Sequence, residues 1–243
     1  MSQSQNGFLA TLSQHDFALI KSDLKTVELP HQAVLYRTGQ PMDRVYFPKT
    51  AVLSLVVRLA SGEMVEIAMM GHDGLVGGCV GLGVTRSLNE VTVQIPGPSF
   101  VLDAAKIKAA AETYPSFRAA LFRREQLVLL QAQQAAACNV NHPIEKRLAR
   151  WLLRSHALAM RDSLPLTQEF LSQMLGVRRT SVTIIANTLQ KAGLIKYRRG
   201  HIQILDAEGL AEVACECHET LKSNSQTMLG IAPAQPAAGT ANA

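Results

Sequence analysis

Residues 27–103 carry short apolar and β-branched runs that are separated by turn residues and show no helical period. The runs include residues 45–47, 52–59, 64–70 and 90–95, and the turns include Ser61-Gly62 and Pro96-Gly97-Pro98. Short strands with Gly and Pro between them predict a small all-β sandwich or barrel. Over residues 8–24, apolar side chains recur at helical spacing, which predicts a helix before the first strand.

Residues 115–141 predict one long helix. These 27 residues hold no Gly and no Pro after Pro115, and they are rich in good helix formers. Apolar side chains cover most of the circumference in the second half, so the helix needs neighbours on both sides. An imperfect heptad through Leu121, Val128 and Ala135 admits two interpretations: contact with a second copy of the chain, or burial within the same chain.

Residues 142–205 predict a winged helix-turn-helix. A helix follows the break at residues 141–143, Thr167 can then cap a shorter helix, and Gly176 supplies the tight turn after it. A second helix is expected over residues 178–191, followed by strands at 194–197 and 202–205 around a Gly-containing turn. In this arrangement the second helix enters the major groove of DNA.

The second helix divides into a buried stripe and a polar face. Val182, Ile185, Ala186 and Leu189 form the stripe, whereas Ile184 stands at the centre of the opposite face. An exposed Ile184 is either incidental or placed against a thymine methyl group. The positions expected to contact base edges are Arg178, Arg179, Thr180, Ser181, Thr183 and Ile184. The positions expected to contact DNA phosphates are Thr167, Lys191, Lys196, Arg198 and Arg199.

Charge supports this division of the chain. The net charge is +5, yet residues 142–205 hold 11 Lys and Arg against 3 Asp and Glu, so the remaining residues are mildly acidic. A basic module joined to an acidic one is typical of two parts with different partners. Residues 223–243 carry no charge and are mostly small or polar, which predicts a disordered tail.

Composition also indicates the cellular compartment of the protein. No apolar run is long enough to cross a membrane, and the first eight residues lack the features of a secretion signal. The four cysteines are too few for a disulfide scaffold. We therefore expect a cytoplasmic protein that has no membrane partner.

Two segments resemble the Crp/Fnr family of bacterial transcription regulators. The stronger is residues 167–182, continuing to Ala192-Gly193-Leu194-Ile195; residues 33–47 echo the family's β-roll. The resemblance implies an α+β chain with three parts: a cyclic-nucleotide-binding-like β-roll over residues 8–114, a dimerisation helix over 115–141, and a winged helix-turn-helix over 142–222. It further implies homodimers on palindromic operators, contact with RNA polymerase, and dimer contacts at Leu121, Val128 and Ala135.

The resemblance also assigns roles near the recognition helix. Arg179 stands where a family arginine reads guanine, whereas two other family readers, a Glu and an Arg, fall on Thr180 and Ile184. The operator sequence therefore stays open.

The resemblance places an effector pocket in the β-roll, at Gly74, Gly77, Gly78, Arg86 and Ser87. Closely spaced glycines let backbone N–H groups approach a phosphate, and arginine can bind it in a bidentate manner. The family's Gly-Glu pair, which holds the ribose, is not matched, because Gly77 is followed by Gly78. A cyclic nucleotide is thus a candidate ligand with an incomplete site. No cysteine precedes Cys79, so we expect no iron–sulfur cluster.

Several other side chains have simpler interpretations. A final helix capped by Asp206 would bury Cys217 in an apolar stripe and turn Cys215 about 140° away from it, so no metal site is expected there. Trp151 is expected in the core. Arg147, Arg150 and Arg154 share one helix face, which is either solvated or in contact with phosphate.

These patterns favour a dimeric, sequence-specific DNA-binding transcription regulator. The alternative is a ligand-sensing β-roll protein that acts mainly through protein–protein contacts. An enzyme is not expected, because no nucleophile–base pair, metal-ligand spacing or catalytic motif stands out.

Overall fold

The computed structural model describes residues 3–228. Its N-terminal part begins with a short 3₁₀ turn, Gln3–Gln5, and two short helices, α1 (Gly7–Thr11) and α2 (Gln14–Lys21). The sequence predicts one helix here, but the Ser13 side chain accepts a hydrogen bond from the Asp16 N–H and starts a new helix.

Two antiparallel sheets form the body of this part. One has the strand order β1-β7-β3 and the other β2-β6-β4-β5. The strands are β1 (Lys25–Leu29), β2 (Val34–Tyr36), β3 (Arg44–Pro48), β4 (Val52–Arg58), β5 (Met64–Met70), β6 (Glu90–Ile95) and β7 (Gly97–Asp103). A 3₁₀ segment, η2 (Gly78–Leu82), lies between β5 and β6. The predicted small all-β unit is confirmed.

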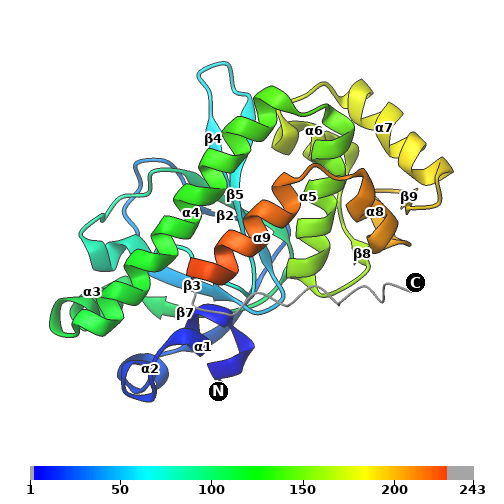
Figure 1. The fold of residues 1–243 in the computed structure, drawn as a ribbon. Helices are drawn as coiled ribbons and strands as arrows, with labels where there is room; N and C mark the ends of the chain where they lie inside the picture. The colour runs from blue at the N-terminus through cyan, green and yellow to red at the C-terminus, as the bar shows by residue number, and fades with distance from the viewer. Residues whose placement is uncertain (1–2, 229–243) are drawn as a thin grey trace, which may run out of the picture.

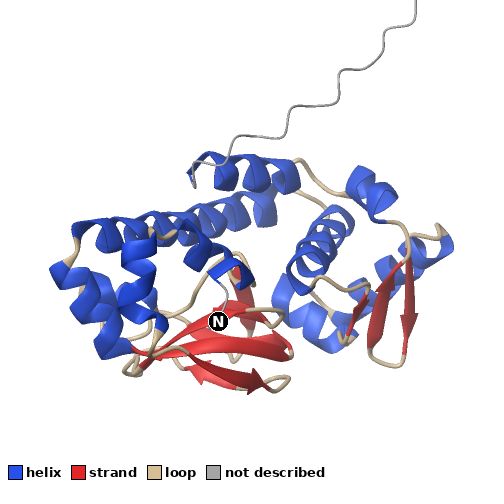
Figure 2. Cartoon of the chain, turned by 90° about the horizontal axis from the view of Figure 1, so that it is seen from below, coloured by secondary structure: helices blue, strands red, loops and turns tan. Residues whose placement is uncertain are grey.

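The core of the β unit is closed by helices. Phe47 of β3, Leu53 of β4 and Phe100 of β7 belong to one buried cluster with Phe117, and each is at most 1% exposed. The cluster also includes side chains of α3 (Ala104–Thr113), which begins at an Asp103 cap. Figure 2 shows α3 and the long helix α4 lying over the strands.

Helix α4 spans Pro115–Asn141 without interruption, as the composition predicts. The heptad through Leu121, Val128 and Ala135 faces the chain itself: Leu121 is 1% exposed in the β-unit core, and Val128 packs against that core. Burial within the chain therefore describes Leu121, whereas contact of the half-buried Val128 with a second copy stays a prediction. The apolar side chains that α4 leaves exposed lie elsewhere on its surface, at Phe122, Leu129 and Val140.

The C-terminal part is a winged helix-turn-helix. Its elements are α5 (Ile144–Ala159), β8 (Ser163–Leu164), α6 (Gln168–Leu175), α7 (Arg179–Lys191), β9 (Ile195–Arg198), β10 (His201–Ile204) and α8 (Ala207–Val213). Thr167 caps α6 through its side chain, as predicted. Gly176, with φ +63°, ends α6 in the left-handed conformation that glycine adopts without strain.

The last described helix, α9 (Cys217–Met228), folds back against α4 (Figure 1). The predicted tail from residue 223 is therefore wrong for residues 223–228, because the contact with α4 extends the helix; residues 229–243 lie outside the described part. The single final helix is also wrong. The backbone leaves the helix after Val213, and Cys215 in the break is 3% exposed rather than turned to solvent.

The two parts share a packed interface rather than a flexible linker. Val52 and Val56 of β4 and Met69 of β5 belong to the same buried cluster as Trp151 and Leu152 of α5. Trp151 is 2% exposed, so its predicted place in the core is confirmed. Within residues 3–228, no helix is long and apolar enough to cross a membrane.

Candidate DNA-binding surface and interdomain cavity

Helix α7 presents an open face on the outside of the molecule (Figure 1). Its inner stripe is buried, with Val182, Ala186 and Leu189 at most 1% exposed, while Ile184 on the opposite side is 67% exposed. The amphipathic division predicted from the helical wheel is confirmed. The exposed side chains of this face take no part in the core, so the face is available to a partner.

The predicted base-contacting residues lie at the start and along the open side of α7. Arg178 is the N-terminal capping residue of α7. The side chains of Arg178, Arg179 and Thr180 are exposed, and that of Ser181 is half-buried. Thr183 has internal partners: its hydroxyl lies 2.7 Å from the Gln168 Oε1 and 3.1 Å from the Arg179 carbonyl oxygen. Thr183 thus ties α7 to α6, and its hydroxyl proton is already used within the protein.

The predicted phosphate-contacting residues are divided between α6, α7 and the hairpin of β9 and β10. Lys191, Lys196, Arg198 and Arg199 are exposed, and Thr167 is half-buried at the start of α6. Arg198 pairs with His201, and the two residues between them, Arg199 and Gly200, have φ of +47° and +80°. Positive φ at both central positions defines the tight turn that closes a two-residue hairpin. The turn holds two arginines at the tip of the wing.

The structure gives the five predicted effector-pocket residues separate packing roles. A Cβ at Gly74 would collide with the Arg124 guanidinium, one at Gly77 would lie 2.9 Å from the Arg44 carbonyl oxygen, and one at Gly78 would lie 2.7 Å from Leu75. The glycines therefore allow close approach of other parts of the chain. Arg86 donates to the Gly39 carbonyl oxygen at 2.7 Å, and Ser87 donates to that of Asn89 at 2.7 Å.

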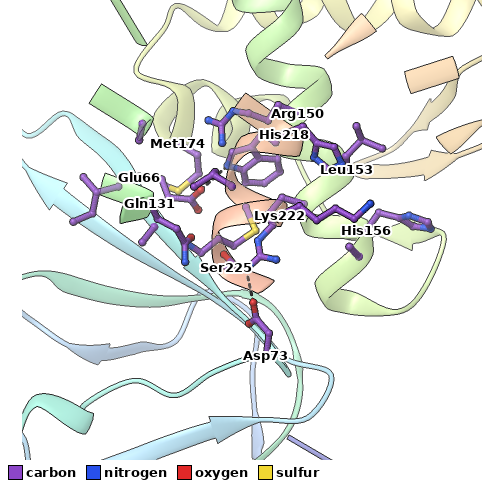
Figure 3. Close-up of a pocket in the computed structure, with 18 of the residues that line it drawn as sticks. Glu66, Asp73, Gln131, Arg150, Leu153, His156, Met174, His218, Lys222 and Ser225 are labelled. Carbon is purple, nitrogen blue, oxygen red and sulfur yellow. Dashed lines mark hydrogen bonds and ion pairs between the residues drawn. The ribbon is translucent and has the colours of Figure 1, made fainter. Parts of the chain in front are cut away.

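A cavity of about 410 Å³ lies between β5, α4, α5 and α9 (Figure 3). None of the five predicted effector residues lines it. Its polar lining includes Glu66, Asp73, Gln131, Arg150, Arg154 and Lys222. The sequence analysis missed this site, although a glutamate inside the apolar run of residues 64–70 and arginines at positions 150 and 154 were available as signals.

The surroundings of Glu66 in the cavity wall favour its protonated form more than water does. The Ser54 hydroxyl lies 2.5 Å from Glu66 Oε2 and 2.6 Å from Gln94 Oε1, but it can donate to only one of these acceptors. A proton on Glu66 would satisfy the other contact. Burial raises the pKa of Glu66 to about 7, against hydrogen bonds from Ser54 and Trp151 that lower it. Gln94 then donates to Ser155 of α5 at 2.8 Å, so the chain of contacts crosses the interface.

We expect Glu66→Gln to remove a pH dependence of stability. A carboxyl whose pKa is raised in the folded state stabilises fully below its unfolded pKa, and this contribution is lost as the pH rises through 7. Between pH 5 and pH 8, the free energy of unfolding of the wild type should fall by roughly 2 kcal/mol more than that of Glu66→Gln. Urea unfolding at both pH values measures it. Glu63→Gln, at an exposed position on the preceding turn, should behave like the wild type.

Asp73 joins the two parts through two arginines. Its carboxylate accepts a hydrogen bond from Arg154 of α5 and lies 3.8 Å from the Arg124 guanidinium of α4. Burial alone would raise the pKa of Asp73, but Arg154 and Arg124 outweigh burial and hold the pKa well below its usual range. Arg124 is 3% exposed, so Asp73 is the counter-charge of a buried cation.

The arginines of α5 face inward, so neither sequence interpretation of this face describes the structure. Arg154 pairs with Asp73, Arg150 lines the cavity, and Arg147 donates to the Leu175 carbonyl oxygen at the end of α6. A cation at the C-terminal end of a helix is favourable. Arg147 therefore ties α5 to α6, and Arg154 ties α5 to the β unit.

The arrangement defines a class of protein: a β-roll joined by a long helix to a winged helix-turn-helix. Comparison with known proteins supports it. Residues 146–213 match the family described as the Crp-like helix-turn-helix domain. The chain is 23% identical over 216 residues to the CRP-like cAMP-activated global transcriptional regulator of Mycobacterium tuberculosis, covering 81% of this chain and 91% of that protein.

Solved structures share the fold. A Crp/Fnr-family transcriptional regulator from Eubacterium rectale superposes with a TM-score of 0.65 at 17% identity, covering 90% of this chain and 99% of that one. FixK2 from Bradyrhizobium japonicum superposes with a TM-score of 0.65 at 14% identity, covering 79% of this chain and 98% of that one. TTHA1359, a CRP/FNR-family regulator from Thermus thermophilus, superposes with a TM-score of 0.63 at 20% identity, covering 78% of this chain and 98% of that one.

The resemblance to the Crp/Fnr family is confirmed. The protein is a DNA-binding transcription regulator with a Crp-like helix-turn-helix, and the alternative of a sensor that acts mainly through protein contacts is not favoured.

Proposed function

We propose that the protein binds a palindromic operator as a homodimer, with α7 of each copy in a major groove. The observation that carries the proposal is the open face of α7, where exposed Arg179, Thr180 and Ile184 lie beside an arginine-tipped wing. A helix in this setting reads base edges from its N-terminal half, and the wing is placed for phosphates. Acting on DNA, the protein belongs in the cytoplasm.

The dimer contact proposed here uses the exposed stripe of α4. Phe122 and Leu129 are seven residues apart, at 55% and 48% exposure, and Val140 is 85% exposed near the end of the helix. Apolar positions repeating at seven residues form the seam of paired helices. The opposite face of α4 already packs on the β-unit core, so the helix has the two sets of neighbours that its composition requires.

The identity and the binding site of a small effector are separate from the proposal on DNA binding. The Mycobacterium relative is described as cAMP-activated, and a cyclic nucleotide is a candidate ligand here. The packing of Gly74, Gly77 and Gly78 against other side chains and backbone gives that ligand no direct support. The interdomain cavity is an alternative location for a small effector. Contact with RNA polymerase is inferred from the family resemblance.

We expect Arg179→Ala to weaken binding to the selected operator by about 1–3 kcal/mol and to relax the preference at one base pair. The reason is that a bidentate arginine–guanine contact is lost while phosphate contacts persist. Sequences are first selected from random DNA with and without cyclic AMP, and affinities are then measured by gel shift at ~150 mM salt, where non-specific binding is weak.

Arg198→Ala is the matched comparison, because Arg198 is a wing arginine placed for phosphate. It should weaken binding to operator and random DNA alike and reduce the dependence on salt. Equal losses for Arg179→Ala on both kinds of DNA would reject its role as a base reader. Failure to select any sequence would reject operator recognition itself.

A further inference from the structure

Three cysteines and a histidine meet where α4 ends and α9 begins. Cys138 lies in the last turn of α4, His142 directly after α4, Cys215 in the break between α8 and α9, and Cys217 at the first position of α9. Their ligand atoms all lie within 4.8 Å of one another. The cysteines are at most 3% exposed, and they form a buried cluster separate from both apolar cores.

The distances within the cluster match those of a metal site. The Cys138 and Cys215 sulfurs are 3.6 Å apart, and the Cys217 sulfur is 3.5 Å from the His142 Nδ1. A tetrahedral zinc with bonds of about 2.3 Å to sulfur and about 2.0 Å to nitrogen separates two sulfurs by about 3.8 Å and a sulfur and a nitrogen by about 3.5 Å. The four side chains therefore need only small movements to share one ion.

Neighbouring groups prepare the donors for a cation. His142 Nε2 lies 3.0 Å from Glu216 Oε1; a proton on Nε2 satisfies this contact and leaves the Nδ1 lone pair directed at Cys217. A carboxylate behind a histidine is the usual support of a zinc ligand. Gln134 donates an N–H to the Cys217 sulfur at 3.0 Å, which stabilises a thiolate.

We propose that Cys138, His142, Cys215 and Cys217 bind one zinc ion as a closed Cys₃His structural site. Thiolate and imidazole donors select zinc over the hard cations, and four protein ligands leave no open position for catalysis. The ion fastens the start of α9 to the point where α4 passes into α5. Because that point joins the β unit to the helix-turn-helix, the metal fixes the position of the DNA-binding part.

The expectation of no metal site came from treating residues 206–221 as one helix. On a single helix, Cys215 and Cys217 point apart and cannot share an ion. The structure breaks the helix before Cys217 and adds two donors from 73 or more residues upstream, at Cys138 and His142, which are one helical turn apart.

The first experiment measures metal content and geometry in the full chain. We expect about one zinc per chain by elemental analysis after purification without chelator. After exchange with Co²⁺, we expect the intense visible absorption of tetrahedral cobalt with thiolate ligands. Cys215→Ser and Cys138→Ser should lose both signals, whereas Cys79→Ser, at the cysteine outside the cluster, should keep them.

A second pair of variants leaves all four donors in place. Glu216→Gln should weaken zinc binding by about 10–100-fold in competition with a chelator, because it removes the support of His142. Glu219→Gln, at an exposed glutamate beside His218, should leave the affinity unchanged. Wild-type protein without zinc or cobalt binding would overturn the proposal. So would a Cys138–Cys215 disulfide that forms in preference to metal binding, detected by thiol titration before and after reduction.

Discussion

Replacing both Phe122 and Leu129 by aspartate is expected to convert the protein to a monomer and to weaken operator binding by about 100-fold or more. Both side chains are exposed in the single chain, so the fold of the monomer does not depend on them. In a symmetric dimer each substitution acts twice. Burial of each apolar side chain contributes about 1.5–3 kcal/mol, and paired aspartates would add repulsion across the seam.

The measurement combines sedimentation equilibrium with gel shifts on a full operator and on a half-site. The double variant should sediment as a monomer and bind the half-site as weakly as the wild type does. Leu88→Asp is the matched control, because Leu88 is 74% exposed and belongs to the segment between η2 and β6 rather than to α4. A dimer with unchanged dissociation constant in Phe122→Asp/Leu129→Asp would refute the proposed seam.

Asp73→Asn is expected to lower the free energy of unfolding by about 3 kcal/mol at pH 7, because it leaves the Arg124 guanidinium without its counter-charge. The same side chain accepts a hydrogen bond from Arg154, so the loss also loosens α5 against the β unit. Urea unfolding measures the first effect, and hydrogen exchange of the α5 amides measures the second.

Two comparisons separate this contribution from a general effect of charge. Asp23→Asn removes the partner of Lys106 in an exposed pair and should cost less than about 1 kcal/mol. Because the pKa of Asp73 is lower in the folded state, its carboxylate stabilises the fold fully at pH values above the unfolded pKa of about 4. This contribution is lost as the pH falls through the folded pKa. The difference between wild type and Asp73→Asn should therefore shrink in acid. Equal effects of Asp73→Asn and Asp23→Asn would contradict the role of Asp73.

The long helix shows the limit of periodicity. Its length followed from helix-forming residues between a proline and a histidine-proline break, all local signals. The face of the helix that meets the β unit did not follow from local signals, because apolar side chains occur nearly all round the helix. Leu121 and Phe122 are neighbours in the sequence, yet one is 1% and the other 55% exposed. Only the packing of α3 and the sheets selects between them.

The same limit applies to charged residues. Arg147, Arg150 and Arg154 recur at helical spacing, which is equally typical of a solvated face and of a phosphate-binding one. The actual partners of Arg147 and Arg154, which are Leu175 and Asp73, are distant in the sequence. The Gly-rich loop behaves likewise: its glycines were interpreted as a phosphate cradle, whereas their neighbours include Arg44 and Arg124 from other elements.

By itself the sequence determined the order of the elements, the helix-turn-helix with its wing, and the open face of α7 around Ile184. These depend on capping residues, turn glycines and apolar spacing within a few residues, which act in any tertiary context. Tertiary structure alone decided the raised pKa of Glu66, the Asp73 ion pairs and the meeting of Cys138 with Cys215. Each needs donors and acceptors from segments far apart in the chain, and their approach is set by how the two parts pack.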